Sequence, residues 1–344
     1  MSFSILQQIN DKKSKINFFS DAQNILLLNG TAWVNFKITK KNNPPHHLIA
    51  KMKPKKFAKK KFLSYHDETE VVWKAPDGER LFDLKEFLKG KALLMIGRTQ
   101  NKEVKGTVRR DCFGIHLTVM NLNRTLKPKH IHKKGLQISL DKVFSDQRSI
   151  TNNINNALVT GRHGNIVVMI VNNLNKAILL MITFSPNGTK VLTRSHAEAD
   201  LMVRGWSHGK CFELKASPGS RFVYLCSYPR QILVYQIQHE RKIIQRKNYV
   251  FEDRVIRPTP KMSGYLSHIF CYSEHKLIVV MNFRKKSEVK LMVFTYNEEK
   301  SRFVRSKVKN SADFDFRGQI KFYRKNGRVY FFDQKQSIYR LTLS

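Results

Sequence analysis

Residues 221–250, RFVYLCSYPRQILVYQIQHERKIIQRKNYV, decide the fold class. The segment contains three apolar runs, RFVYLCS (221–227), QILVYQIQ (231–238) and KIIQRKNYV (242–250), joined by short polar connections. Runs of this length that are rich in Val, Ile, Leu and aromatic residues are typical of strands, and short connections join strands into hairpins. The segment therefore predicts three antiparallel strands in a meander.

The same trio of runs recurs along the second half of the chain. Its members are 165–171, 176–184 and 189–196; then 221–227, 231–238 and 242–250; then 276–283, 288–296 and 302–309; and finally 327–333 and 336–343. The first runs begin at 165, 221, 276 and 327, so the unit repeats about every 50 to 56 residues. A repeat of this period made of antiparallel strands is the sequence pattern typical of propeller blades.

Over residues 165–343 this spacing and strand pattern resemble a degenerate β-propeller. The glycine-histidine and tryptophan-aspartate signatures of that family are missing, and the nearest pieces are Arg204-Gly205-Trp206 and Ser207-His208-Gly209. The resemblance implies an all-β fold in which each blade buries its two apolar faces against neighbours. We expect about six to seven blades, and an N-terminal strand within 15–38 that closes the ring by completing the last blade.

The first half has similar patterns with less regularity. Hairpins are expected at 24–38 around Asn-Gly and at 70–84 around Pro-Asp-Gly, strands at 91–97, 103–110 and 113–122, and a helical turn or two at 83–90. We expect an N-terminal extension at 1–20 and a propeller over 21–344 that carries a basic insertion at 40–64. The alternative is an N-terminal barrel or sandwich to about residue 150, with a domain boundary in the polar, Asn-rich stretch 145–164.

Charge is the most unusual property of the chain. Its 344 residues carry 63 Lys and Arg against 26 Asp and Glu, a formal net charge of +37, and the excess extends over both halves. Self-repulsion of this size works against a compact fold. The composition therefore predicts a polyanionic partner.

The basic charge is densest in KMKPKKFAKKKF (51–62), within a stretch that has no acidic residue between Asp21 and Asp67. A block of like charges repels itself and is expected to stay mobile until a partner neutralises it. The chain has 41 Lys and 22 Arg, which favours contact with phosphates over recognition of base edges. Phe57 and Phe62 are candidates for stacking on bases or for packing into the body. Two other interpretations are a solvated loop in a lysine-rich chain and a targeting signal in PKKFAKKK.

Smaller basic clusters occur at KPKHIHKK (127–134), RKIIQRK (241–247) and RKK (284–286). The last two fall at predicted turns, where loops are available for binding. The full set of candidate nucleic-acid-binding residues is Lys51, Lys53, Lys55, Lys56, Lys59, Lys60, Lys61, Lys127, Lys129, Lys133, Lys134, Arg241, Lys242, Arg284, Lys285 and Lys286.

The sequence favours a non-enzymatic, basic scaffold that docks on a polyanion, with RNA in a large ribonucleoprotein assembly as the leading partner and neighbouring proteins around it. One alternative is a scaffold for acidic proteins or an anionic membrane surface. Another is a propeller enzyme of unknown reaction. No phosphate-binding glycine motif or nucleophile elbow is present, and we expect no cofactor.

Cysteine and histidine patterns complete the expectations. Cys112, Cys211, Cys226 and Cys271 form no CxxC pair, which favours a reducing, intracellular compartment: nucleus, cytoplasm or an organelle such as the mitochondrion. No apolar run is long enough for a transmembrane helix. His196, Glu198 and Asp200 alternate in sequence, and on a strand they would place three potential metal ligands on one face. A polar turn between blades is the preferred interpretation, so no metal site is expected.

Overall fold

The structure is a computed structural model of the chain. It describes residues 22–28, 31–38, 46–52, 69–75, 79–99, 114–122, 129–130, 136–139, 153–172, 177–199, 213–227, 231–250, 264–283, 288–297, 299–300, 302–306, 321–325, 328–332 and 338–341. These residues form strands and turns with no helix among them, so the fold is all-β. No helix able to cross a membrane is found in this part of the chain.

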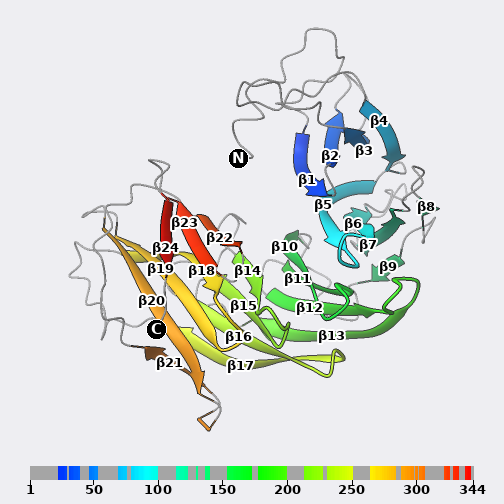
Figure 1. Ribbon diagram of the computed structural model, residues 1–344. Helices are drawn as coiled ribbons and strands as arrows, with labels where there is room; N and C mark the ends of the chain where they lie inside the picture. The colour runs from blue at the N-terminus through cyan, green and yellow to red at the C-terminus, as the bar shows by residue number, and fades with distance from the viewer. Residues whose placement is uncertain are drawn as a thin grey trace, which may run out of the picture. The chain divides into compact units, whose positions relative to one another are not determined.

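The strands are grouped in antiparallel sheets, which we letter A to F (Figure 1). Sheet A contains β1 (Ala22–Leu28), β2 (Thr31–Ile38), β3 (His46–Met52) and β4 (Thr69–Lys74). Sheet B contains β5 (Glu79–Phe87), β6 (Ala92–Thr99), β7 (Gly114–Asn121), β8 (Lys129–His130) and β9 (Leu136–Ser139). Sheet C contains β10 (Asn153–Thr160), β11 (Ile166–Asn172), β12 (Ala177–Phe184) and β13 (Val191–Ala199).

The remaining strands continue the series. Sheet D contains β14 (Glu213–Ala216), β15 (Phe222–Ser227), β16 (Gln231–Gln238) and β17 (Lys242–Val250). Sheet E contains β18 (Gly264–Cys271), β19 (Lys276–Phe283), β20 (Glu288–Asn297) and β21 (Arg302–Ser306). Sheet F contains β22 (Lys321–Lys325), β23 (Arg328–Phe332) and β24 (Ile338–Leu341).

The order of strands within the sheets is simple. In sheets A, C, D and E the four strands pair in chain order, each antiparallel to the next. Sheet F is a three-stranded version of the same meander among the described residues. In sheet B, β8 and β9 pair with different parts of the edge of β7 that is not occupied by β6.

The chain forms two compact units. Unit 1 consists of Met1–Asn152, His163–Asn165 and Phe184–Val191; unit 2 consists of Asn153–Arg162, Ile166–Thr183 and Leu192–Ser344. The first change of unit, after Asn152, falls within 145–164, but two later segments return to unit 1. The one-domain and two-domain interpretations both remain predictions.

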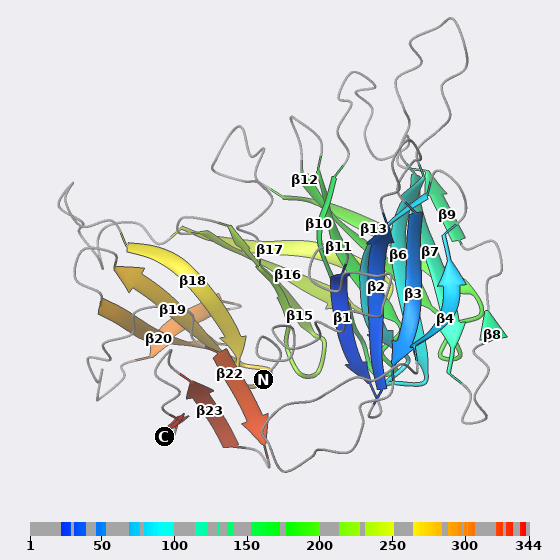
Figure 2. The same ribbon diagram turned by 90° about the horizontal axis from the view of Figure 1, so that it is seen from above.

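The core of unit 2 consists of stacked sheets, with sheet D between C and E (Figures 1 and 2). Successive residues of β15 and β16 point to opposite faces. One face of sheet D joins the core with sheet C through Val223, Leu225, Leu233, Tyr235 and Ile237. The other face joins the core with sheet E through Phe222, Tyr224, Cys226, Ile232 and Val234. The two central strands are therefore buried on both sides, which explains why they are continuously apolar.

Polar contacts connect successive sheets of unit 2 at their first strands. The N–H of Ile269 in β18 donates to Glu213 Oε2 in β14 at 2.9 Å. Ser220 Oγ, in the turn after β14, accepts a hydrogen bond from Gly161 N at 2.7 Å and contacts Thr160 Oγ1 at the end of β10. The sheets thus join through equivalent elements, which is what a repeated unit requires.

Unit 1 has its own core between sheets A and B. Leu28, Trp33, Ile49, Leu81, Leu84, Leu93, Met95 and Met120 form its buried cluster. Within this unit Leu88 N donates to Gly164 O at 2.9 Å, and Phe87 and Phe184 meet edge to face with centroids 5.2 Å apart. Gly188 has a φ of 74°, in the left-handed region that favours glycine, and a Cβ there would lie 2.9 Å from Leu88 Cδ1, so the leucine side chain would have to shift.

Sequence patterning predicted the strands of the repeating trios well. Strands β11 to β13, β15 to β17, β19 to β21, β23 and β24 lie where the trios predict them. The first strands of sheets C to F were missed: β14, for example, is only ELKA, with Leu214 its one buried residue, and β10 lies in the stretch interpreted as a polar connection. Strand β10 forms because Ile154 and Ala157 are buried while its backbone pairs with β11.

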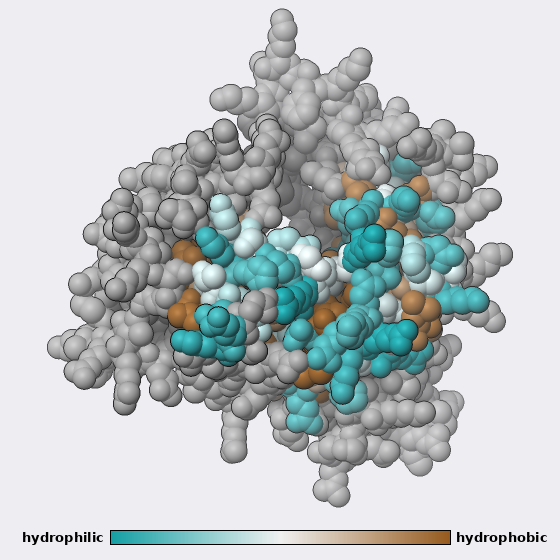
Figure 3. Space-filling view, turned by 60° about the horizontal axis from the view of Figure 1, so that its bottom comes forward, coloured by the Kyte–Doolittle hydropathy of each residue, from teal (hydrophilic) through white to brown (hydrophobic). Residues whose placement is uncertain are grey.

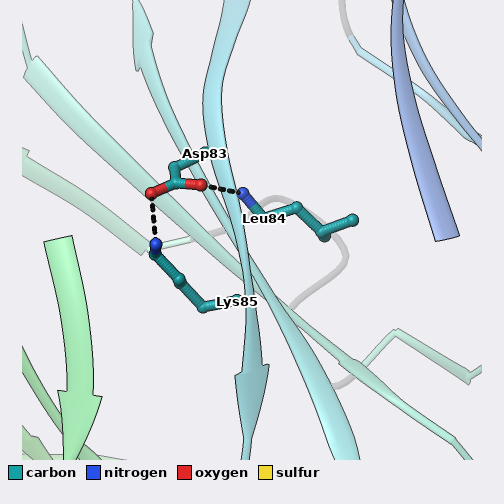
Figure 4. A network of polar contacts seen from close by, with 3 residues as sticks. All are labelled: Asp83, Leu84 and Lys85. Carbon is teal, nitrogen blue, oxygen red and sulfur yellow. Dashed lines mark hydrogen bonds and ion pairs between the residues drawn. The ribbon is translucent and has the colours of Figure 1, made fainter. Parts of the chain in front are cut away.

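The helical turn expected at 83–90 is wrong. Residues 79–87 are strand β5, and the change of register between Leu81 and Asp83 is a β-bulge that breaks the alternation of apolar residues. Asp83 accepts from Leu84 N at 2.8 Å and pairs with Lys85 Nζ at 2.9 Å, so its buried carboxylate is satisfied within the strand (Figure 4).

Two connections also differ from expectation. The predicted hairpin at 70–84 is wrong, because β4 pairs with β3 and β5 pairs with β6 in another sheet. The closing N-terminal strand is wrong for the described residues of 15–38, because β1 and β2 pair with each other in sheet A. A local hairpin loses little loop-closure entropy compared with pairing to a strand near residue 340. Residues 15–21, and the strand expected at 103–110, lie outside the described residues.

Candidate functional site

Four of the predicted basic residues fall in the described part of the chain: Lys51, Lys129, Arg241 and Lys242. The others lie outside it: Lys53, Lys55, Lys56, Lys59, Lys60, Lys61, Lys127, Lys133, Lys134, Arg284, Lys285 and Lys286. The placement of the four can therefore be compared with expectation.

Lys51 and Lys129 are parts of sheets. Lys51 is half-buried in β3, opposite Trp33 on one side and Glu70 on the other. The expectation of a mobile block that includes Lys51 is wrong at this residue. Leu48, Ile49 and Ala50 just before it are buried in sheet A and hold the strand as far as Met52. Lys129 lies in the short strand β8, opposite Asn121.

Arg241 and Lys242 lie at a tight turn between β16 and β17. His239 and Glu240 have φ of 48° and 57°, as in the two-residue hairpin turns whose twist matches that of the flanking strands. Both basic side chains are exposed, as predicted from their position at a turn.

A second turn, between β10 and β11, is joined to this one. Glu240 Oε1 accepts from Arg162 N at 3.4 Å, and its backbone O accepts from Thr183 Oγ1 at 2.6 Å. Arg162 is exposed and so joins Arg241 and Lys242 in what we call the turn cluster, defined by these three residues. The sequence did not predict Arg162, because one basic residue in a polar stretch carries no distinguishing signal.

The three cations of the turn cluster share their two turns with one carboxylate, that of Glu240. Among the residues that the structure describes, these three cations form no ion pair. Two ion pairs of the described residues lie elsewhere, between Lys85 and Asp83 at 2.9 Å and between Lys215 and Glu213 at 3.1 Å, each along one strand. Among the residues coloured in Figure 3, hydrophilic ones predominate over small hydrophobic patches.

Residues 196–199, within the stretch interpreted as a polar turn, belong to strand β13. Along β13 the burial alternates, and Leu192, Arg194, His196 and Glu198 lie on the exposed face. His196 and Glu198 do share a face, while Asp200 lies outside the described residues. No group of three His, Cys, Asp or Glu residues suited to a metal ion occurs in the described ranges.

Cys226 lies in the core of sheet D. Burial raises the pKa of its thiol well above the usual range, and the carboxylate of Glu213 acts in the same direction. A thiol of this kind stays protonated at neutral pH, unlike the thiolate of a nucleophile or metal ligand. Cys226 therefore acts as a small apolar side chain.

No known protein-family profile matches the sequence, and no curated protein is similar to it. Among solved structures, Sqt1 from Chaetomium thermophilum is similar at 11% identity over 92% of this chain and 71% of that chain, with a TM-score of 0.46. A functionally unknown protein from Desulfotomaculum acetoxidans is similar at 10% identity, over 93% and 84% of the two chains, with a TM-score of 0.44. Likenesses with TM-scores this low do not assign the chain to a family.

Proposed function

We propose that the sheets are blades of a degenerate β-propeller with about six to seven blades. Two observations support this fold: the four-stranded meander repeats, and sheet D stacks between C and E through both of its faces. In a propeller each blade packs in this way against the next around a ring. Strand β14, the first strand of sheet D, contacts both β10 and β18, the first strands of sheets C and E. This arrangement is consistent with a propeller, in which the first strands of successive blades lie side by side around the central axis.

We further propose that the protein is a non-enzymatic scaffold that docks on RNA within a large ribonucleoprotein assembly. The observation that carries this is the excess positive charge: a net +37, with Arg162, Arg241 and Lys242 on two joined turns that also carry Glu240. Cations held at fixed positions lose little entropy when phosphates replace their counterions, and the released counterions favour binding. The lysines from Lys53 to Lys61 form a second, denser group of positive charges in the sequence.

Copurification followed by nuclease treatment tests the proposal. The protein isolated from cells at low salt should carry bound RNA, and ribonuclease should release its partners. Material that survives nuclease and proves to be acidic protein or lipid would contradict RNA docking and support the alternative scaffold.

A variant series tests which charges matter. Replacing Lys53, Lys55, Lys56, Lys59, Lys60 and Lys61 with glutamine should lower retention on immobilised RNA and shift elution to lower salt. The unfolding transition should be unchanged, which separates lost contact from lost fold. Unchanged retention would remove this segment from the proposed interface.

A further inference from the structure

A cluster of cationic and aromatic side chains in unit 2 is separate from the turn cluster. It joins the turn after β14, the turn between β18 and β19, and the end of β20. The Arg221 guanidinium lies 5.2 Å from the ring centroid of Phe222 and 5.6 Å from that of Tyr296. The ring of His275 is stacked with that of Tyr296, with centroids 6.4 Å apart and an angle of 26°. These four residues come from four elements, since Phe222 is the first residue of β15.

The cluster is held in place by backbone contacts. The Glu274 carboxylate accepts from Ser217 Oγ at 2.6 Å, Gly219 N at 2.6 Å and Arg221 N at 3.0 Å, which ties one turn to the other. Gly219 allows this approach, because a Cβ there would lie 2.7 Å from Glu274 Oε2. Tyr296 N donates to His275 O at 2.7 Å. The carboxylate and the backbone thus fix both Arg221 and His275.

The rings rest on a rigid base. Tyr296 packs against Phe222 at 4.9 Å and Phe303 at 5.1 Å between ring centroids, and these two are buried. Exposure increases outward from this base: Tyr296 and Arg221 are half-buried and His275 is exposed. Arg221, Tyr296 and His275 are therefore flat, polarisable groups that reach the solvent and are supported from below by buried rings.

Groups of this kind suit an unpaired nucleobase. Single-stranded RNA offers bases that stack on histidine and tyrosine rings and on arginine planes, and this contact tolerates any base. Lys276 and Lys300 are accompanied by Glu274 and Glu299 in the same turns, so the excess positive charge here comes from Arg221 and from Arg302 on β21. Stacking would therefore act at this cluster together with charge.

We propose that Arg221, His275 and Tyr296 form a stacking platform for an unpaired base of single-stranded RNA. This inference rests on the proposed RNA docking and assigns to it a contact that the turn cluster cannot make. Electrostatic attraction brings the strand to the protein and weakens in salt. The platform adds a contribution that largely persists in salt.

Binding to two probes tests the platform. Fluorescence anisotropy would measure the affinity of the whole protein for oligouridylate, which has bases, and for heparin, a polyanion without them. His275→Ala and Arg221→Lys should each weaken oligouridylate binding about tenfold, the order expected for one stacked base. Heparin binding should be unchanged for both variants. Arg221→Lys keeps the positive charge at that position, and the proposed contribution of His275 is stacking on a base, which heparin lacks.

Matched variants control for structure. His196→Ala removes another exposed histidine, on β13, and should leave both affinities unchanged. His275→Phe keeps an aromatic ring and should retain oligouridylate binding. Rescue by phenylalanine distinguishes stacking from any hydrogen bond of the imidazole.

The outcomes separate this inference from the function on which it rests. If oligouridylate binds with a steep salt dependence but His275→Ala and Arg221→Lys leave it unchanged, the platform is wrong and RNA docking stands. If the wild-type protein binds neither probe, both proposals are wrong. Equal weakening for both probes would also overturn the platform, because heparin has no base to stack.

Discussion

Strands β15 and β13 belong to neighbouring sheets of unit 2 and differ in what they bury. In β15, residues 222–226 are all buried, alternately in the core with sheet E and in the core with sheet C. In β13 the burial alternates, so one face packs on the core and the other shows Leu192, Arg194, His196 and Glu198 to solvent. The central strand β15 is therefore a part of the core, whereas β13 leaves one face exposed.

The sharpest test of this difference compares two leucines. Leu225 is fully buried, and Leu225→Ala should lower the free energy of unfolding by about 3 kcal/mol through lost burial and a cavity. Leu192, 57% exposed on β13, provides the control, and Leu192→Ala should change stability by less than about 0.5 kcal/mol. Urea denaturation measures both. Equal effects would mean that sheet D does not pack on sheet C through the face that carries Leu225.

A smaller effect is expected at the connection between sheets D and E. Glu274→Ala leaves three donors, Ser217 Oγ, Gly219 N and Arg221 N, without their charged acceptor, which should cost about 2 kcal/mol. Glu299→Ala, at an exposed turn of the same sheet, should cost almost nothing. Thermal unfolding would compare them. Equal transition temperatures for the two variants would contradict an ordered connection at Glu274.

The buried thiol should make stability depend on alkaline pH. The pKa of Cys226 is raised in the folded protein, so above the ordinary thiol pKa the unfolded chain has lost a proton that the folded chain retains. Unfolding is then favoured as pH rises, by up to about 1.4 kcal/mol per pH unit. Cys226→Ala should lack this pH dependence of the free energy of unfolding, although its stability at neutral pH differs from that of the wild-type protein. Parallel pH profiles for the two proteins would show that Cys226 is not desolvated.

The smallest effect on stability is expected at the turn cluster. Replacing Arg162, Arg241 and Lys242 with glutamine should change the free energy of unfolding by less than about 0.5 kcal/mol, because all three are exposed. The same variant should reduce the salt dependence of single-stranded RNA binding by about 2 in the slope of log K against log salt. A large loss of stability with unchanged RNA binding would contradict the account, because it would show that these three residues stabilise the fold and do not contact RNA.

The contrast between β15 and β13 also explains what the sequence could predict. FVYLC and ILVYQI are apolar runs because both their faces are buried, so the central strands were found from the residues alone. Strand β14 has four residues and one buried leucine, a signal too weak to distinguish from a turn. Its formation depends on pairing with β15 and on the contact of Glu213 with β18.

The candidate sites divide in the same way. Arg241 and Lys242 are adjacent in a basic cluster, so the sequence predicts their exposed turn. Arg162, Arg221, His275 and Tyr296 each carry no local pattern, and only the stacking of sheets brings them to their partners. Long-range packing is what a single sequence does not encode locally.

The most direct test of the account is the affinity of the whole protein for oligouridylate measured over a series of salt concentrations. We expect log K to fall linearly and steeply with log salt, because several phosphates would displace counterions when they bind to the basic turns. An affinity that does not change with salt, or no binding at low salt, would contradict the claim that the excess positive charge serves to hold RNA.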